Sequence, residues 1–382
     1  MKDIIEIYGR VVSVRKHKNS VFIDIFSNKT KIEQCTLVDT ENDIHIGDIL
    51  HSTDFYEGVS KRGTPTVFLN SYQIVGKPQK IITKKGLITY AEKPTTQLQQ
   101  EALLGGNSLQ IALARIQIYQ AAMKFLNEKG FVQVFSDNLD DCRGAYSAIP
   151  FEVYNKAIEK EQYLRITLEL ELKKQMCFFL KPVYELGKVY RNMGKNIDHA
   201  QEFSTLETVI PFASLQDIYS ILYELVVALF NSTSSSSLST VSDIVKKPVI
   251  ISYDELMQDE SISFKECKQN LQNHIVYNIP QQSPLAKWND KSALEFVWVF
   301  NGCVLSHGYE DEYDIEILQK RFQYQIDKLQ KEGIFAEMDK SFLDTIALGM
   351  PASSSFSLGL DRLIQKIFSL SNINTATNPL GV

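Results

Sequence analysis

The sequence lacks an apolar run of about 18 residues, the length that a transmembrane helix requires, so no membrane-spanning helix is expected. Its N-terminal segment, MKDIIEIYGR, lacks the basic, apolar and small-residue order of a signal peptide. The five cysteines are scattered and contain no CxxC pair, which argues against a disulfide framework and a cysteine zinc site. The net charge of -6 excludes a wholly basic nucleic-acid binder but permits a local basic patch. These absences predict a cytoplasmic protein without membrane partners.

The composition is that of a globular protein. With 44% hydrophobic and 23% charged residues, the chain has enough apolar side chains to form a core. Its length of 382 residues exceeds what one hydrophobic core usually organises, so two domains are expected. We place the first domain at residues 1–85, a linker at 86–97 and the second domain at 98–382.

The first domain contains short runs of β-forming residues and no convincing helix. Polar or glycine-containing turns separate these runs, as in small closed barrels. The pattern predicts a five-stranded barrel of the OB type, with strands at Ile4–Val14, Val21–Phe26, Lys31–Val38, Ile49–Tyr56 and Thr66–Ile74.

The first hairpin of this barrel combines positive charge with aromatic side chains. Single-stranded nucleic acid needs cations for its phosphates and flat partners for its bases. Because Phe22 and Phe26 are separated by an even number of residues, they share one strand face. The hairpin therefore suits either nucleic-acid binding or a charged turn over a barrel core that contains both rings. Its basic residues are Arg10, Arg15, Lys16 and Lys18.

The second domain mixes helices with strands and shows no βαβ regularity, which predicts an α+β fold with an antiparallel sheet. Apolar residues at helical spacing predict helices over Leu109–Lys129, Gln216–Phe230 and Ile315–Lys331. Strands are expected at Phe131–Phe135, Tyr163–Ile166, Ala293–Leu305 and within SFSLGL.

The segment Val183–Ile210 reads as two strands joined by a polar loop. Arg191 ends the first strand, and Phe203 lies early in the second. The guanidinium can fork onto phosphate oxygens and the ring can stack on a base, so the pair could form a nucleotide platform. An ordinary hairpin with a solvated arginine is the alternative.

Several segments together resemble the class II aminoacyl-tRNA synthetases, and among them the lysyl-tRNA synthetases. YRNMGKNIDHAQEFSTLE resembles the second signature motif of that family, and GLDRL resembles the third. LRITLELELKK, RGAYSAIPF, IPQQSPLAK and the barrel hairpin GRVVSVRKHKNSVFIDI are similar to further family segments, in the family order. The resemblance runs from about residue 5 to residue 365.

The resemblance implies an ATP-dependent enzyme that uses Mg²⁺, with tRNA and an amino acid as partners and a homodimer as its assembly. It places Arg191 on the α-phosphate of ATP and Arg362 on the γ-phosphate, as the catalytic residues. His199 is expected near the phosphates and Phe203 on the adenine, and Gly359 belongs to the ATP-binding third motif.

The resemblance also assigns residues to the amino acid, the tRNA and the metal. Glu169 matches the carboxylate that binds the amino group. Arg15, Phe22 and Gln34 match anticodon contacts in the barrel, and Glu295 matches one Mg²⁺ ligand. The other residues expected around the amino acid are Gly144, Glu207, His307, Tyr309 and Asp311, the last three standing where the family has Asn, Phe and the Glu that reads the lysine ammonium.

The chain departs from the family pattern at several of these segments. Met193 replaces an acidic residue, Val209 replaces a pocket tyrosine, and Val304 stands where a second Mg²⁺-binding Glu is expected. Ser355, Phe356 and Ser357 replace glycines of the third motif. The residues thus leave three hypotheses: an aminoacyl-tRNA synthetase, a paralogue that delivers the acyl group to a protein or a small-molecule amine, or a binding protein without catalysis.

Overall fold

The computed structural model describes residues 6–17, 20–28, 31–37, 43–78, 82–83, 86–87, 99, 101–233, 242–258, 262–280, 283–289 and 291–381. Backbone contacts divide the chain into two compact units, Met1–Leu113 with Asn378–Val382 and Ala114–Thr377. The expected linker at 86–97 lies mostly outside the described residues; its first two residues form the strand β7 (Gly86–Leu87), which pairs with β6 (Ile82–Thr83). The division at residue 98 stays a prediction.

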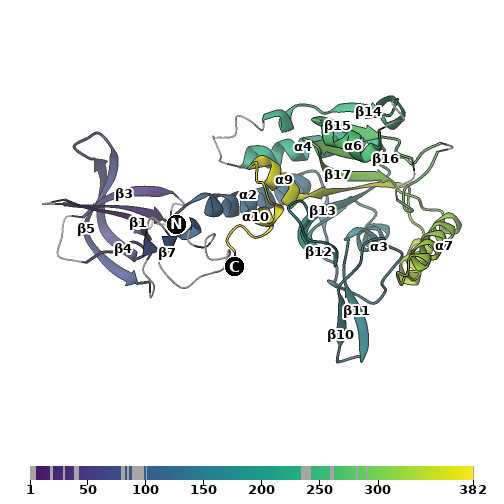
Figure 1. Ribbon diagram of the computed structural model, residues 1–382, viewed down its shortest axis with the longest axis horizontal. Helices are drawn as coiled ribbons and strands as arrows, with labels where there is room; N and C mark the ends of the chain where they lie inside the picture. The colour runs from purple at the N-terminus through teal and green to yellow at the C-terminus, as the bar shows by residue number, and fades with distance from the viewer. Residues whose placement is uncertain are drawn as a thin grey trace. The chain divides into compact units, whose positions relative to one another are not determined.

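The first unit contains a closed barrel with the strand order β1-β2-β3-β5-β4 (Figure 1). Along the second strand, Val21, Ile23 and Ile25 are buried and the residues between them are half-buried, so the period of two separates a core face from an outer face. The five-stranded barrel expected from the sequence is confirmed. Its strands are β1 (Ile7–His17), β2 (Ser20–Ser27), β3 (Ile32–Leu37), β4 (Ile49–Val59) and β5 (Pro65–Gly76).

The second unit is built on an eight-stranded sheet. The strands between its two edges pair antiparallel with their neighbours, and the edge strands at each end pair in parallel. The predicted α+β fold is confirmed. In spatial order the strands are β14 (Val249–Ser252), β15 (Asn273–Tyr277), β16 (Glu295–Phe300), β17 (Cys303–Glu310), β18 (Ser353–Gly359), β13 (Glu202–Pro211), β12 (Val183–Tyr190) and β8 (Val132–Gln133).

Helices cover both faces of this sheet. The helix α4 (Leu215–Ser232) covers one face, where Tyr219 packs edge-on against Phe296 with 5.1 Å between ring centroids. The helix α3 (Glu169–Phe179) lies on the other face, where Glu169 accepts a hydrogen bond from the hydroxyl of Tyr309. Since Phe296 and its neighbour Glu295 point to opposite faces, Glu295 belongs to the α3 side.

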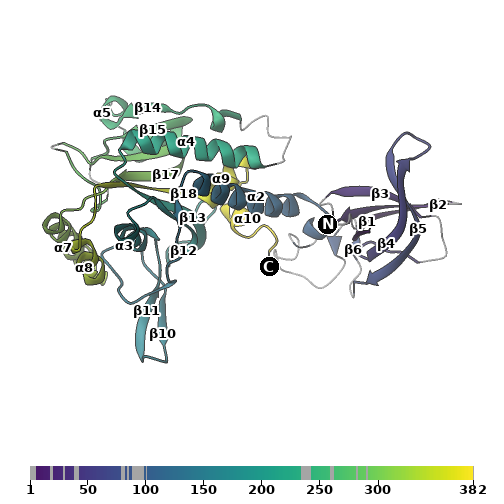
Figure 2. The same ribbon diagram turned by 180° about the vertical axis from the view of Figure 1, so that it is seen from behind.

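The second unit also contains a small three-stranded sheet and further helices. The strands β10 (Glu152–Asn155) and β11 (Lys160–Leu164) project as a hairpin, and β11 also pairs with β9 (Leu139–Asp140) (Figure 2). In the part of the chain that is described, no helix has the length and hydropathy needed to cross a membrane. The further helices are α2 (Asn107–Glu128), η1 (Ser242–Val245), α5 (Tyr253–Leu256), α6 (Phe264–Asn270), α7 (Ile315–Lys331), α8 (Lys340–Ala347), α9 (Leu360–Ile367) and α10 (Ile373–Thr377).

Candidate active site

The β12–β13 hairpin brings a cation and an aromatic ring together. Arg191 follows β12 directly, and its main-chain N–H donates a 2.8 Å hydrogen bond to the carbonyl of Gln201. Its guanidinium lies 5.1 Å from the centroid of the Phe203 ring, a separation at which cation–π attraction acts. Side chains alternate along a strand, so Phe203 and Glu207 share one face of β13. Arg191 thus contacts the second strand of its own hairpin, β13, through Phe203.

A cavity of about 550 Å³, which we call the arginine cavity, lies between the loop after β12, the strand β17 and the start of α9. Gly359 precedes the first residue of α9, and Arg362 lies in the first turn of that helix. The Nη1 atom of Arg362 donates a 3.0 Å hydrogen bond to the carbonyl of Val304. All residues expected to bind ATP line this cavity: Arg191, His199, Phe203, Gly359 and Arg362.

The electrostatics of the arginine cavity favour an anion. The protein atoms around the guanidinium lower the pKa of Arg191, the carboxylate of Glu207 raises it, and the nearby cation of Arg362 lowers it further. Within the described residues, neither arginine forms an ion pair with a carboxylate. Negative charge placed between Arg191 and the Arg362 cation that lowers its pKa would stabilise both guanidinium groups. A polyphosphate has that charge.

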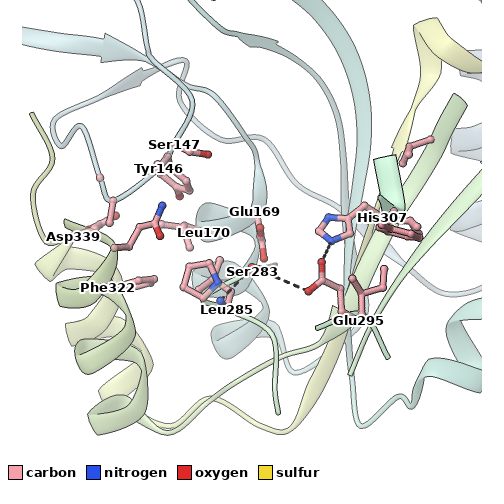
Figure 3. Close-up of a pocket in the computed structure, with 18 of the residues that line it drawn as sticks. Tyr146, Ser147, Glu169, Leu170, Ser283, Leu285, Glu295, His307, Phe322 and Asp339 are labelled. Carbon is pink, nitrogen blue, oxygen red and sulfur yellow. Dashed lines mark hydrogen bonds and ion pairs between the residues drawn. The ribbon is translucent and has the colours of Figure 1, made fainter. Parts of the chain in front are cut away.

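A second cavity of about 480 Å³, the acidic cavity, adjoins the first. Figure 3 shows Glu169 and His307 on its wall, with the Glu295 carboxylate hydrogen-bonded to His307 and to the main chain of Ser283. Arg362, Val304 and His307 line both cavities, so the two are neighbours along β17. The site residues expected at this cavity are thereby close to those expected at ATP.

Gly144 lies on the wall of the acidic cavity in a conformation that other residues rarely adopt. Its φ is +71°, and a Cβ atom there would meet the ring of Tyr146 at 2.7 Å. A side chain at this position would be both strained and crowded. The main chain at Gly144 can therefore lie directly against a bound molecule.

Two carboxylates meet where α3 begins. Glu207 is buried, and its Oε2 accepts hydrogen bonds from the hydroxyl of Thr167 at 3.0 Å and from the main chain of Leu168 at 3.2 Å. Burial raises the pKa of Glu207 to about 7, and the neighbouring Glu169 raises it as well. Two carboxylates at one site favour a bound cation, because a positive charge relieves their repulsion.

Lys173 is the site residue that sequence reasoning missed. It is 1% exposed and forms ion pairs with Glu169, one helical turn earlier, and with Asp311 at 3.1 Å. Its ammonium also lies 4.9 Å from the centroid of the Tyr309 ring. The spacing of Glu169 and Lys173 was a signal in the sequence, because residues four apart meet on a helix. No signal in the sequence indicated the ion pair between Lys173 and Asp311.

Asp311 is the one predicted site residue of this unit that lines none of the described cavities. It is 1% exposed, and besides Lys173 it accepts hydrogen bonds from the hydroxyls of Ser353 at 2.6 Å and Ser355 at 2.7 Å. The other predicted residues do line a cavity, and His307 lines the arginine cavity, the acidic cavity and a small cavity between them.

Comparison with known proteins assigns the family. Residues 100–378 match the family described as tRNA synthetases class II (D, K and N). The chain belongs to this family. A lysine–tRNA ligase from Thermoanaerobacter pseudethanolicus is 25% identical over 426 aligned residues, which cover 94% of this chain and 83% of that protein. A lysine–tRNA ligase from Mycoplasma pneumoniae is 26% identical over 420 aligned residues, covering 96% and 85%. The resemblance to lysyl-type class II synthetases is confirmed.

Class II synthetases use ATP, but the residues of this synthetase do not fit a Mg²⁺ ion held by protein ligands. Glu295 is fully buried and already pairs with His307 at 2.6 Å, and Val304 offers no oxygen ligand from its side chain. Mg²⁺ requires hard oxygen ligands, which in nucleotide sites come from one or two carboxylates together with phosphates and waters. No group of three His, Cys, Asp or Glu side chains that could hold a metal occurs among the described residues.

The residues expected to bind tRNA share the outer face of the barrel. Arg15 is the cross-strand neighbour of Phe22, and Gln34 is the neighbour of Asp24, two residues along the same face of β2. Phe22 is half-buried and packs edge-on against His17, at 5.6 Å between ring centroids. Arg15 pairs with Asp24 at 2.8 Å while its side chain stays 45% exposed. The alternative of a core position for Phe22 and Phe26 is wrong. Lys18 lies outside the described residues.

Proposed function

We propose that this synthetase activates an amino acid with ATP as an aminoacyl-adenylate and transfers it to tRNA. The relatives compared with it are named lysine–tRNA ligases, so lysine or a related amino acid is the proposed substrate. One observation carries the proposal: Arg191 and Arg362, which form no ion pair with a described residue, line a cavity that adjoins the one lined by Glu169. An anionic nucleotide and an ammonium-bearing amino acid would thus bind side by side.

The proposed reaction is a substitution at phosphorus. A carboxylate oxygen of the amino acid attacks the α-phosphorus of ATP, and the bond from that phosphorus to the oxygen bridging the β-phosphate breaks. Pyrophosphate leaves with the electron pair of that bond. Arg191 would stabilise the charge that builds at the α-phosphate, and Arg362 would hold the γ-phosphate. Phe203, which already contacts the guanidinium of Arg191, would stack on the adenine.

Glu169 has the geometry to bind the amino group. Lys173 and Tyr309 both donate to its Oε1 atom, and no described residue donates to its Oε2 atom, which would accept a further donor at the acidic cavity. An ammonium there would form a charge-assisted hydrogen bond. Binding the amino group at Glu169 would direct the carboxylate of the amino acid toward Arg191, because positioning converts two bound reactants into one reacting pair.

We assign tRNA binding to the barrel domain, residues 1–85, and catalysis to residues 98–382. The support is the shared outer face of Arg15, Phe22 and Gln34, which offers a cation, a ring and an amide to an unpaired base. We also propose that the synthetase is a homodimer that joins along the sheet edge at β8. That edge strand pairs only with β12 in the described sheet, and Phe135 beside it is 79% exposed.

The test is amino-acid-dependent ATP–pyrophosphate exchange in wild type and two variants, one directly after β12 and one on it. Arg191→Ala should lower exchange by about 10²-fold or more, the usual cost of losing a charge-stabilising donor. Lys188→Ala, which removes an exposed cation paired with Glu202, should leave exchange within about twofold of wild type. Circular dichroism checks that both variants fold. Near-wild-type exchange in Arg191→Ala would refute the proposed role of this arginine.

A further inference from the structure

The space beside the two carboxylates is small. A cavity of about 30 Å³, the side-chain pocket, lies between Glu169 at the start of α3 and the strands β13, β17 and β18. A volume of this size holds roughly two water-sized groups. The strand residues around it include Glu207, Val209, Tyr309, Ser355 and Ser357. The side chain of an amino acid whose amino group binds Glu169 would enter here.

Two hydroxyls help to fill this pocket. Ser355 and Ser357 stand on β18 where the related family segment has glycines, so each adds a hydroxymethyl group to the pocket wall. The hydroxyl of Ser355 donates to Asp311 at 2.7 Å, and that of Ser357 donates to the carbonyl of His307 at 3.3 Å. Both serines are thus held in place by hydrogen bonds.

Asp311 is withdrawn from the pocket by its partners. Its Oδ1 contacts Lys173 at 3.1 Å and Ser355, and its Oδ2 accepts from Ser353 at 2.6 Å. With both oxygens engaged and 1% of its surface exposed, Asp311 does not line the side-chain pocket and is not presented to a substrate ammonium there. Burial lowers the pKa of Lys173, but Asp311 and Glu169 raise it more, so the lysine stays charged. A second ammonium in that place would be repelled.

Glu207 is the remaining anion of the side-chain pocket. Both hydrogen bonds to its carboxylate end on Oε2, and Oε1 accepts none from the described residues. The carboxylate also lines the arginine cavity, so it lies near the mouth of the side-chain pocket. Because Glu207 lines this small pocket and Asp311 lines none of the described cavities, a cationic group that enters the pocket reaches Glu207 and not Asp311.

We propose that the amino acid activated by this synthetase is a diamino acid with a shorter side chain than lysine, whose terminal ammonium is bound by Glu207. Lys173 determines this specificity because its ion pair with Asp311 keeps that carboxylate from the substrate. Ser355 contributes because its side chain separates the pocket from Asp311. The proposal rests on the adenylation activity proposed for the same site, and it names the substrate class.

The experiment is ATP–pyrophosphate exchange by the full chain with lysine, ornithine, 2,4-diaminobutyrate, 2,3-diaminopropionate and alanine. One of the shorter diamino acids should exceed lysine in kcat/KM by at least about tenfold, since a misplaced methylene costs about that factor in a closed pocket. Lysine or alanine as the best substrate would overturn this inference and leave adenylation standing. Exchange with none of them, by folded protein, would overturn adenylation itself.

A variant pair tests the cause of the specificity. In the double variant Asp311→Glu with Ser355→Gly, the longer carboxylate can reach the pocket and the hydroxyl is gone, so the ratio of kcat/KM for lysine to that for the preferred short substrate should rise at least about tenfold. Ser354→Gly is the matched control, because its hydroxyl donates to the Ala213 carbonyl at 2.7 Å and does not line the pocket. An unchanged ratio in the folded double variant would refute the role of Asp311 and Ser355. If that variant does not fold, the wild-type series decides.

Discussion

At the scale of single residues, the adjacent side chains of Asp361 and Arg362 at the start of α9 have different roles. Asp361 is buried, pairs with Arg115 and accepts a 2.7 Å hydrogen bond from the main chain of Ser204. Asp361→Ala would remove the only carboxylate paired with the half-buried Arg115 among the described residues and leave the buried N–H of Ser204 without its acceptor, so we expect a loss of about 3 kcal/mol in the free energy of unfolding. Urea denaturation measures this loss.

Arg362→Ala is the comparison for that variant. Arg362 is half-buried, and its side chain donates one hydrogen bond among the described residues, to the Val304 carbonyl, so its removal should change the free energy of unfolding by less than about 1 kcal/mol. Its exchange activity should nevertheless fall by about 10²-fold. Equal losses of stability in the two variants would contradict the distinction between an internal and a substrate-binding charge.

The raised pKa of Glu207 predicts that the stability of the protein depends on pH. Its folded-state pKa, raised to about 7 from 4.5, means that the folded protein binds a proton that the unfolded chain has released. This contribution to stability is present below pH 4.5 and is lost as the pH rises to about 7. Glutamine does not titrate, so the Glu207→Gln variant does not show this loss of stability. The free energy of unfolding of the variant, relative to that of wild type, should therefore increase by up to about 3 kcal/mol between pH 4.5 and 8.

Urea titrations at several pH values check the Glu207 prediction. Glu202→Gln is the control, since this carboxylate is exposed on the same strand and its stability difference from wild type should vary much less with pH. A difference for Glu207→Gln that does not change with pH would show that Glu207 titrates normally in the fold.

At the scale of elements, the sequence predicted the parts whose pattern is local. The hairpin of β12 and β13 follows from apolar alternation around a polar loop, and α7 has the predicted bounds because Asp314 caps its first turn. The strand expected at Phe131–Phe135 shrinks to β8, Val132–Gln133, because it has a single partner strand at the sheet edge. The strands β10, β14 and β15 were not predicted, since four or five residues carry too little periodicity.

The site was predictable to the same extent. Residues inside a motif, such as Arg191 and Phe203, could be grouped from the sequence, and they do line one cavity. The partners of Asp311 could not, because Lys173 and Ser353 come from α3 and β18 and meet it only through tertiary packing. A charge that the sequence presents as available can thus be satisfied inside the protein.

The proposed dimer at the β8 edge of the sheet can be tested by substitution. If two copies join at β8, the exposed ring of Phe135 would be buried between them, and Phe135→Arg should convert a dimer to a monomer in sedimentation velocity. Phe335→Arg changes a ring that is 62% exposed in the segment between α7 and α8, and this control should remain dimeric. A monomeric wild type at micromolar concentration would contradict the proposed dimer.

At the scale of the whole molecule, the negative net charge is unfavourable for general binding of nucleic acid. The net charge of -6 repels a polyanion, so tRNA affinity should depend on local cations such as Arg15 on the outer face of the barrel. The double substitution Arg15→Ala with Phe22→Ala should weaken tRNA binding by at least about tenfold and reduce its dependence on salt. Filter binding between 50 and 200 mM salt, about the range over which phosphate contacts lose affinity, measures both effects.

Lys124→Ala is the control for the barrel variant. Lys124 is an exposed cation on α2, with 77% of its side chain in solvent, so its loss removes the same charge from another surface. Its tRNA affinity should stay within about twofold of wild type. An unchanged affinity in the Arg15 and Phe22 variant would show that the barrel does not bind tRNA through this face.

The most direct test of the proposed adenylation is detection of its product. The full chain is incubated with ATP and the amino acid panel, separated from free ligands by gel filtration, and examined by mass spectrometry for a bound adenylate. We expect the mass of AMP joined to one amino acid of the panel, present in wild type and in Lys188→Ala and absent in Arg191→Ala. No bound adenylate from folded wild type with any amino acid, and no ATP–pyrophosphate exchange in the same preparation, would contradict the proposal that this synthetase activates an amino acid.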